Sequence, residues 1–412
     1  MKTTIKYILF FLLYFGIHYF EGLPPIGSLS VAQAWKLPLI LLLIIYCFVS
    51  KKKKQPFVKT SFILAFLMLF NIDFLIFPTA TIAGATKILP LALFFQYFSE
   101  QFGQKMQKLE NILFVFAQFI AITSLITLLG IVQPLYEYGI AIQFGIDDME
   151  YYSSLFYAPH CASSYFAVST IVLVYGFLQK RFKTFISKLF NATLIVILLI
   201  SIFKAFVRTG WLMLIVGISV LIFSQTKLSL KQFVLSIIVF GILTGGVVYL
   251  YNTNEAIHAR INGVNMYDDN SGENIDVDGS GRIEFWKNGF DLWTRSDNIF
   301  ELLFGQGFTK VAENNEHFTG LRVVSHNQFI DSLSQHGLIC YILLILFYIQ
   351  LYRYIRKFTS HQYYKLSLSI FWMTIIFAFF QNEMYFDYAI LFAIVLSLLN
   401  IEKTKIIMVP NT

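Results

Sequence analysis

A histidine and an asparagine stand side by side before an apolar run, in the segment "RVVSHNQFIDSLSQHGL" at residues 322 to 338. Ser325 or Asn327 can cap the helix that we expect to follow, which would leave backbone N–H groups that suit a phosphate. The imidazole of His326 has an ordinary pKa near neutral pH, so it can take a proton from a hydroxyl group or steady a developing charge. The alternative is a structural histidine that bonds to the loop backbone.

Two further cations, Lys204 and Arg208, lie one turn apart at the outer end of a predicted spanning helix, in "SIFKAFVRTGW". A cation at that depth costs roughly 3 kcal/mol unless it faces protein, water or an anion. Both side chains could snorkel to the lipid headgroups, or they could bind an anion near the outer leaflet. The residues leave both interpretations open.

Arg282 follows the turn "DVDGSG" and begins a helix-like stretch. Its planar guanidinium suits two phosphate oxygens at once, which a lysine cannot imitate. The turn also partly resembles a calcium-binding loop, with Asp276 and Asp278 in register. Position twelve of that loop is Lys287, where a bidentate Glu is required. We therefore interpret it as an ordinary acidic turn and expect neither a metal nor a cofactor.

The remaining histidines and the cysteines have no comparable context. We expect the histidines to be structural or to face solvent; they are His18, His160, His258, His317, His336 and His361. The three cysteines, Cys47, Cys161 and Cys340, lie in or next to apolar runs without paired spacing. This pattern predicts neither a disulfide nor a thiolate metal site.

The composition indicates the solvent in which these residues work. Hydrophobic residues make up 57% of the 412-residue chain and charged residues only 13%, with 45 Phe and 23 Tyr. That is more apolar surface than a soluble domain could cover, so the chain is predicted to be an all-α polytopic membrane protein. The first 20 residues resemble a secretory signal, but no convincing cleavage site follows them, and we expect a first spanning helix there.

Apolar runs of roughly 17 to 22 residues predict about twelve spanning helices. They lie near residues 5–22, 35–50, 60–78, 82–99, 112–132, 162–179, 189–206, 210–225, 233–251, 329–350, 366–381 and 386–400.

The distribution of charge orients these helices. With a cytoplasmic N-terminus, the inside connections and the two ends hold 21 of the 31 Lys and Arg but only 3 of the 24 Asp and Glu. This positive-inside pattern accounts for the net charge of +7 without a nucleic-acid partner. We therefore expect both termini in the cytoplasm and functional chemistry on the outer face.

Ten basic residues do not follow the inside rule, and most of them could be solvated or paired with acids of the external loop. They are Lys36, Lys87, Lys204, Arg208, Arg260, Arg282, Lys287, Arg295, Lys310 and Arg322.

The same orientation divides the chain into three parts: helices one to nine at 1–251, an external catalytic loop at 252–328, and three last helices at 329–412. The loop is acidic and lacks Pro, so we expect an ordered cap of helices and turns rather than a linker. Within "RIEFWKNGFDLW" the apolar residues have helical spacing and could lie on the bilayer surface or on the bundle. They are Ile283, Phe285, Trp286, Phe290 and Trp293.

The order of motifs resembles a known group of proteins. "VRTGW" at an outer helix end, followed in a long external loop by "GSGRIEFWKNGF", "ELLFGQGF" and "SHNQFIDSLSQHGL", resembles the bacterial O-antigen ligase and O-antigen or capsule polymerase superfamily. The detailed likeness covers roughly 200 to 350. It implies a metal-independent membrane glycosyltransferase whose fold is related to the GT-C class.

The resemblance also implies roles for particular residues. Arg208 and Arg282, with Lys204 beside them, would hold the diphosphate of an undecaprenyl-diphosphate-linked glycan, and His326 would be the catalytic or acceptor-activating residue. Gly305 and Gly307 would form a tight turn that positions the loop.

Three functions follow, of which we favour the first. A polymerase joins O-antigen or capsule repeat units, and the Phe- and Lys-rich composition is typical of a surface-polysaccharide locus. A ligase shares the donor chemistry but transfers the glycan to a lipid A-core or a protein. A flippase for the same lipid would also fit about twelve helices. Transporter halves usually echo one another, however, with interrupted helices and polar residues near the midplane, and the sequence shows no such echo.

The predicted orientation can be tested with introduced cysteines. Asn270→Cys and Glu313→Cys should react with a membrane-impermeant thiol reagent added outside intact cells, and Lys52→Cys should not, because only the first two lie in the external loop. The unsubstituted protein controls for its own cysteines. Labelling of Lys52→Cys alone would place the loop in the cytoplasm and would overturn the site assignments.

Overall fold

The structure is a computed structural model that describes residues 2–25, 30–71, 73–103, 105–135, 137–139, 150–156, 158–224, 252, 282–320, 322–381 and 384–400. Every structural statement below concerns these residues. The predicted span at 233–251, the calcium-like turn with Asp276 and Asp278, and Arg260 and His258 lie outside them.

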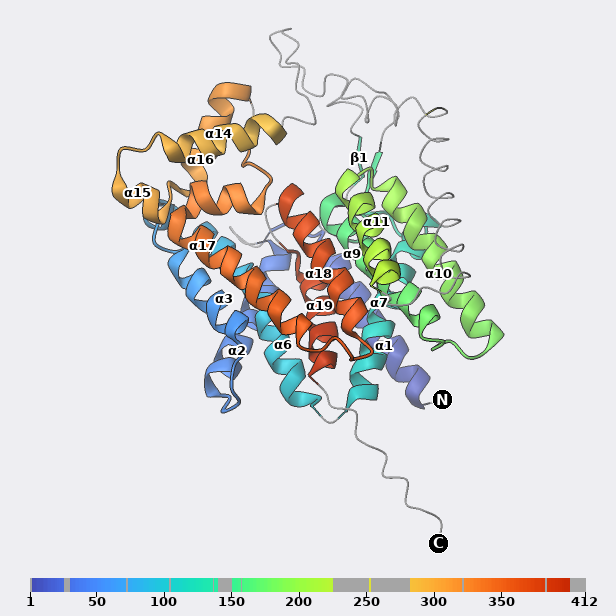
Figure 1. The fold of residues 1–412 in the computed structure, drawn as a ribbon. Coiled ribbons are helices and arrows are strands. Elements are labelled where there is room, and N and C mark those ends of the chain that lie inside the picture. Colours follow the sequence, from blue (N-terminus) through green and yellow to red (C-terminus); the bar gives the residue numbers. More distant parts are fainter. Residues whose placement is uncertain are drawn as a thin grey trace.

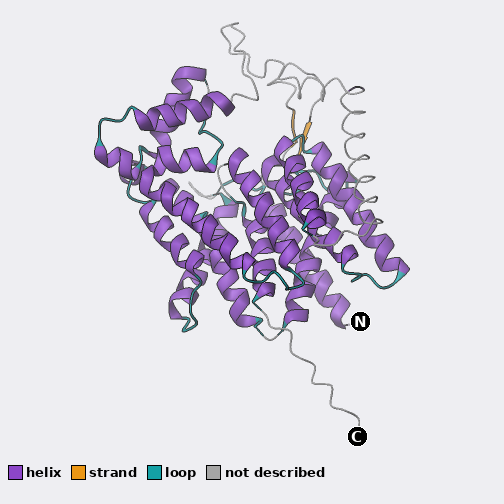
Figure 2. Cartoon of the chain, viewed as in Figure 1, coloured by secondary structure: helices purple, strands orange, loops and turns teal. Residues whose placement is uncertain are grey.

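The described chain is almost entirely helical, as predicted (Figures 1 and 2). The helices are α1 (Lys2–Phe20), α2 (Val31–Val49), α3 (Pro56–Leu67), α4 (Asp73–Ile76), α5 (Pro78–Thr86), α6 (Leu89–Gln101), α7 (Met106–Leu128), α9 (Pro159–Leu178), α10 (Phe185–Lys204), α11 (Arg208–Phe223), α14 (Arg282–Thr294), α15 (Ile299–Phe304), α16 (Gly307–Thr319), α17 (Gln328–Arg356), α18 (Tyr364–Phe380) and α19 (Phe386–Leu399). Two three-residue strands, β1 (Glu137–Gly139) and β2 (Glu150–Tyr152), pair antiparallel in the first predicted external segment.

Helices α9 and α19 form the centre of the bundle, because nearly all their residues are buried. Helices α7, α10 and α11 pack around α9, and α6 and α7 pack against α19. Within the described residues, α2, α7, α9, α10 and α17 are long and apolar enough to cross a membrane. The all-helical membrane character is therefore confirmed, while the count of twelve spans and the relation to GT-C stay predictions.

The predicted spans at 60–78 and 82–99 are not continuous helices, so these two predictions were wrong in detail. Helix α3 ends at Leu67 after 12 residues and α6 has 13, and the short helices α4 and α5 lie between them. Crossing a hydrocarbon core takes about 20 residues. Hydropathy did not reveal the break, because apolar residues such as Phe70 and Phe74 surround Asn71 and Asp73.

The described part of the loop that we predicted to be external is a cap of three helices, α14 to α16, above the start of α17 (Figure 1). The five apolar residues of α14 divide between two faces. Phe285 is buried, Trp286 lies with its ring centroid 6.0 Å from Phe380, and Trp293 Nε1 donates to Leu302 O at 3.0 Å. Ile283 and Phe290 are exposed. The loop over 282–320 is therefore ordered, as expected.

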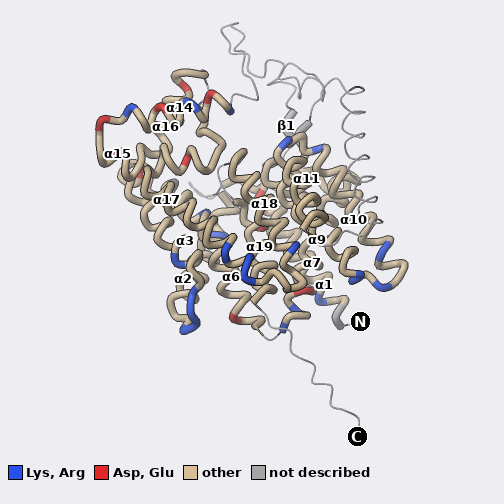
Figure 3. Tube along the Cα trace, in the orientation of Figure 1, with Lys and Arg blue, Asp and Glu red and all other residues tan. Residues whose placement is uncertain are grey.

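Lys and Arg gather toward the lower end of the bundle in Figure 3, the end at which the N-terminus lies. Acidic residues are most frequent on the α14–α16 cap at the opposite end. The charge pattern read from the sequence thus separates two ends of one folded bundle. The side that faces the cytoplasm stays a prediction.

The cap is joined to α17 by a contact between two glycine backbones. Helix α17 is broken at Gly337, with φ 79° and ψ 177°, and Gly305 ends α15 with φ 85° and ψ 171°. Only glycine adopts this region readily. A Cβ on Gly305 would collide with the backbone of Gln335 and His336, and one on Gly337 with that of Leu303 and Gly305. Gln306 N also donates to Ser334 O at 2.9 Å across the same contact.

Gly305→Ala and Gly337→Ala should each lower the free energy of unfolding by about 2 to 4 kcal/mol, because strain and backbone collision add. Thermal unfolding of the detergent-purified protein measures this. Gly84→Ala is the matched control, since a Cβ there meets nothing within 4 Å, and it should stay within about 1 kcal/mol of the wild type. Equal stability of all three variants would show that the glycine contact is not needed.

Candidate active site

The loop that carries His326 is held by the carboxylate of Asp331. Ser325 N donates to Asp331 Oδ1 at 2.9 Å, and Asn327 N lies 3.4 Å from Oδ2. Asp331 is 5% exposed, so the two contacts are made away from solvent. His326 between them takes φ of +51°, a left-handed conformation that is uncommon for residues other than glycine. These two contacts therefore hold the backbone on both sides of His326.

Asn327 caps α17, and its Oδ1 accepts from Phe329 N at 3.0 Å and Ile330 N at 3.2 Å. Gln328 N donates to Gln381 O at 3.1 Å. The N–H groups of the first turn are therefore occupied. The expectation that they would be left for a phosphate was wrong, because the cap and the end of α18 use them.

Arg282 and His326 come together although 44 positions separate them. Helix α14 begins at Arg282 and packs on the loop, where a Cβ on Gly289 would lie 2.6 Å from Ser325 Oγ. The Arg282 guanidinium lies 5.9 Å from the ring centre of Phe380, at the end of α18. Burial and the positive charge of Arg282 lower the pKa of His326 from 6.5 to about 4. The imidazole is therefore neutral at pH 7 and able to accept a proton.

Lys204 and Arg208 are not one turn apart on a single helix, which corrects the expectation from sequence. Lys204 is the last residue of α10 and Arg208 the first of α11, and the turn between them contains Phe206 with φ of +51°. Both side chains are exposed. The Lys204 ammonium lies 5.6 Å from the ring centre of Tyr152.

Arg208 nevertheless lies at the same end of the bundle as His326. Gly210, in the first turn of α11, packs against Ser163 near the start of α9. One turn earlier in α9, His160 Nδ1 lies 2.9 Å from the Gln381 amide, whose backbone carbonyl meets Gln328 N. The starts of α9, α11 and α17 and the end of α18 therefore meet there. The contact of His160 with Gln381 agrees with the structural role expected for this histidine.

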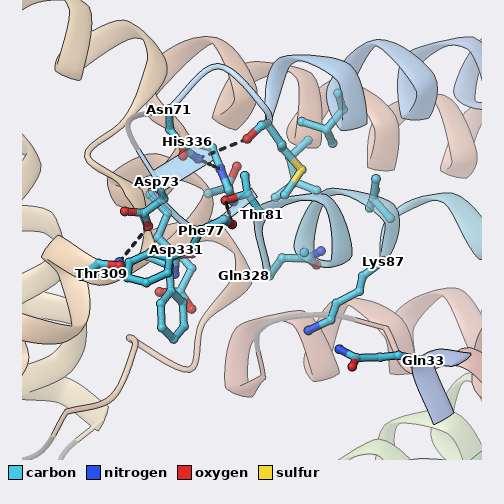
Figure 4. Close-up of a pocket in the computed structure, with 18 of the residues that line it drawn as sticks. Gln33, Asn71, Asp73, Phe77, Thr81, Lys87, Thr309, Gln328, Asp331 and His336 are labelled. Carbon is cyan, nitrogen blue, oxygen red and sulfur yellow. Dashed lines mark hydrogen bonds between the residues drawn. The ribbon is translucent and has the colours of Figure 1, made fainter. Parts of the chain in front are cut away.

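A pocket of about 560 Å³ lies beside the His326 loop, and Asp331, which holds that loop, is one of its lining residues. Figure 4 shows that polar side chains line it from the break after α3, from α5, from the start of α16 and from the first part of α17. Those used below are Asn71, Asp73, Gln328, Asp331 and His336. His336, which we expected to be structural or solvated, is one of them. The signal that could have revealed the pocket is Asn71 and Asp73 inside an apolar run.

Several cations outside the inside rule have acidic partners, as the alternative interpretation allows. The pairs are Lys36 with Glu21 at 2.8 Å, Arg295 with Asp291 at 3.3 Å, Lys310 with Glu301 at 3.1 Å, and Arg322 with Glu313 at 3.0 Å. Among the described residues, no group of three His, Cys, Asp or Glu could hold a metal ion.

Comparison with known families gives one match. Residues 193–345 match the family described as O-antigen ligase. The matched stretch contains Lys204, Arg208, Arg282 and His326, together with the glycines of "LFGQGF". A search of curated proteins found no match.

The match falls on the residues that carry the resemblance, and five helices of the described chain are apolar and long enough to span a membrane. Over residues 193–345 the chain is similar to the O-antigen ligase family, and its long apolar helices are those of a multi-pass membrane protein.

Proposed function

We propose that the protein is a membrane glycosyltransferase that moves glycan from an undecaprenyl diphosphate to a hydroxyl group of an acceptor at the outer face of the inner membrane. One observation carries this proposal. A neutral, half-buried imidazole, that of His326, lies close enough to the guanidinium of Arg282 for that charge to lower its pKa. Such a pair supplies a base for the acceptor and a cation for the departing diphosphate.

The donor requires cations at the outer headgroup level, because a polyprenyl chain is too apolar to leave the bilayer. When the anomeric carbon–oxygen bond to the diphosphate breaks, negative charge grows on the departing oxygen and must be stabilised. Arg282 can meet two phosphate oxygens with its fork. Arg208 and Lys204, at the same end of the bundle, are the further cations proposed for the diphosphate.

The acceptor hydroxyl must lose a proton as its oxygen bonds to the anomeric carbon. His326 is proposed to receive that proton. In the unliganded protein its pKa of about 4 makes it a weak base. A bound diphosphate would neutralise the Arg282 charge and raise the pKa of the imidazole, so the base would gain strength when the donor is in place.

Polymerase is the activity that we favour, with repeat units of O-antigen or capsule as acceptor. The matched family is described as O-antigen ligase, which in general implies a lipid A-core acceptor and keeps the ligase as the alternative. The donor chemistry is common to both. Assays that offer either repeat-unit glycan or lipid A-core as acceptor separate them.

A flippase remains a second candidate. The sequence showed no interrupted helices, which was an argument against a flippase, but the structure contains two. The break between α3 and α6 and the break of α17 at Gly337 are interrupted helices around a polar pocket, as transporters have. An assay in vesicles that follows lipid-linked glycan across the bilayer, with no acceptor present, would show this activity.

His326→Ala should leave the protein at normal abundance and able to bind the lipid-linked donor, while glycan transfer falls by roughly 100-fold or more. Transfer and donor binding are measured on the same purified preparation. Asn327→Ala should reduce transfer less than His326→Ala does. It removes a helix cap, which lowers the free energy of unfolding by about 1 kcal/mol. Equal loss of binding and transfer would make His326 a donor ligand, and normal transfer would make it structural.

Arg282→Lys should impair transfer almost as much as Arg282→Ala, because charge without the fork loses the paired contact to phosphate. The acid limb of the kcat/KM profile should distinguish the two variants. Loss of the positive charge in Arg282→Ala makes protonation of His326 easier and raises its pKa, so activity is lost at a higher pH. In Arg282→Lys the limb should stay near that of the wild type. Full activity of the lysine variant would refute the clamp.

A further inference from the structure

The pocket beside the His326 loop is polar where the surrounding helices are apolar. It lies between two interrupted helices: α3 ends at Leu67, and α17 is broken at Gly337. Broken backbone at membrane depth is tolerated only where it is buried in protein or lines a cavity. The two breaks turn Asn71, Asp73 and His336 toward a common space (Figure 4). Residues at both helix breaks therefore line the pocket.

Hydrogen bonds fix which atoms of the pocket donate and which accept. Asn71 Nδ2 lies 3.1 Å from Met68 O, an acceptor, so the amide must be oriented with its nitrogen there. The same nitrogen lies 3.3 Å from His336 Nδ1, which must then accept, and the ring proton is on Nε2. Asn71 Oδ1 is buried and has no hydrogen-bond partner in the described structure. A hydroxyl group, which both donates and accepts, complements this pair.

The charges of the pocket disfavour a phosphate. Asp73 and Asp331 are each 5% exposed, and each accepts a backbone N–H, from Thr309 at 2.9 Å and from Ser325 at 2.9 Å respectively. Lys87 lies at the far end, beside Gln33 (Figure 4), and Arg322 at the rim is paired with Glu313. A diphosphate placed inside this pocket would therefore be repelled by the carboxylates of Asp73 and Asp331.

A sugar ring fits these groups. Carboxylates and amides bind hydroxyl pairs, and the rings of Phe77 and Phe308 line the pocket where the C–H face of a sugar could pack. A volume of about 560 Å³ is in the range of small-molecule sites. Asp331 both lines the pocket and holds the backbone on either side of His326. A ligand in the pocket would therefore lie next to the loop that carries the imidazole.

We propose that this acceptor-sugar pocket, defined by Asn71, Asp73, Asp331 and His336, binds an uncharged sugar residue of the acceptor glycan. The inference rests on the proposed function, because it names the second substrate of that transfer. It assigns the two substrates to different chemistry: cations for the diphosphate donor, and amides, carboxylates and an imidazole for the hydroxyl-rich acceptor.

Two measurements on the purified full chain test the pocket. The first is binding of the free repeat-unit oligosaccharide, released from the cells' own surface polysaccharide by mild acid and carrying no diphosphate. The second is transfer at varied acceptor concentration. Asn71→Ala and His336→Leu should weaken oligosaccharide binding and raise the acceptor KM at least 10-fold, with donor binding unchanged. His336→Gln should recover part of the loss, because its amide can replace the Nε2–H donor.

A matched control separates binding from folding. Asn191 is also a buried asparagine of a membrane helix, bonded to Gln118 and Ser187 outside the pocket, and Asn191→Ala should leave oligosaccharide binding unchanged. Thermal unfolding of all variants shows which of them are folded. If Asn191→Ala weakens binding as much as the pocket variants, the effect is one of stability and the proposal is overturned.

Other outcomes are equally decisive. Unchanged oligosaccharide binding in folded Asn71→Ala and His336→Leu overturns the pocket. Loss of donor binding in place of oligosaccharide binding also overturns it, because the pocket would then belong to the donor. Oligosaccharide binding that depends on Asn71, in a wild-type protein that shows no transfer, refutes the proposed glycosyltransferase but supports a glycan site.

Discussion

The buried carboxylate of Asp331 is the group on which the arrangement of the site depends. A carboxylate away from water must be satisfied by donors, and here the donors are the backbone N–H groups on either side of His326. That requirement holds the loop in a shape in which the histidine takes a left-handed conformation, at a cost of order 1–3 kcal/mol. The hydrogen bonds to the buried carboxylate therefore offset the strain in the backbone at His326.

The surroundings of His326 connect its chemistry to the donor. Burial, together with the positive charge of Arg282, lowers the pKa of His326 and keeps the imidazole neutral. The same guanidinium can pair with a phosphate. Under the proposed function, the bound anionic donor offsets the positive charge of Arg282. The pKa of His326 then rises, and the imidazole becomes a stronger base. Donor binding and proton transfer to His326 would then be coupled through Arg282, without a conformational change.

Buried charges elsewhere stabilise the bundle. His18 Nε2 lies 2.9 Å from Asp387 Oδ2, Tyr14 donates to the same oxygen at 2.8 Å, and Lys36 pairs with Glu21. Charges inside a membrane bundle are costly unless they are paired in this way. These contacts join the consecutive helices α1 and α2 to each other and α1 to α19, which lies at the other end of the sequence. His18 is thus structural, as its lack of sequence context suggested.

Composition and charge by themselves determined the membrane class and the helical content, because burial of apolar surface in lipid and the positive-inside pattern are properties of residue order. The order of "VRTGW", "GSGRIEFWKNGF" and "SHNQF" also identified Arg208, Arg282 and His326 as candidates. Asn327 could be anticipated as a cap for the same reason, since capping depends only on neighbouring residues.

Only the tertiary structure decided how these residues meet. The pKa of His326 depends on its burial and on Arg282, 44 positions away in the sequence. The pocket depends on a break after α3, where hydropathy predicted a continuous helix. Asn71 and His336 are ordinary side chains until the fold places them 3.3 Å apart. Lys204 and Arg208 lie on two helices and not on one as predicted, because α10 ends before the turn that contains Phe206. Long-range packing sets such contacts, and a local pattern of residues carries no record of which distant segment will pack against it.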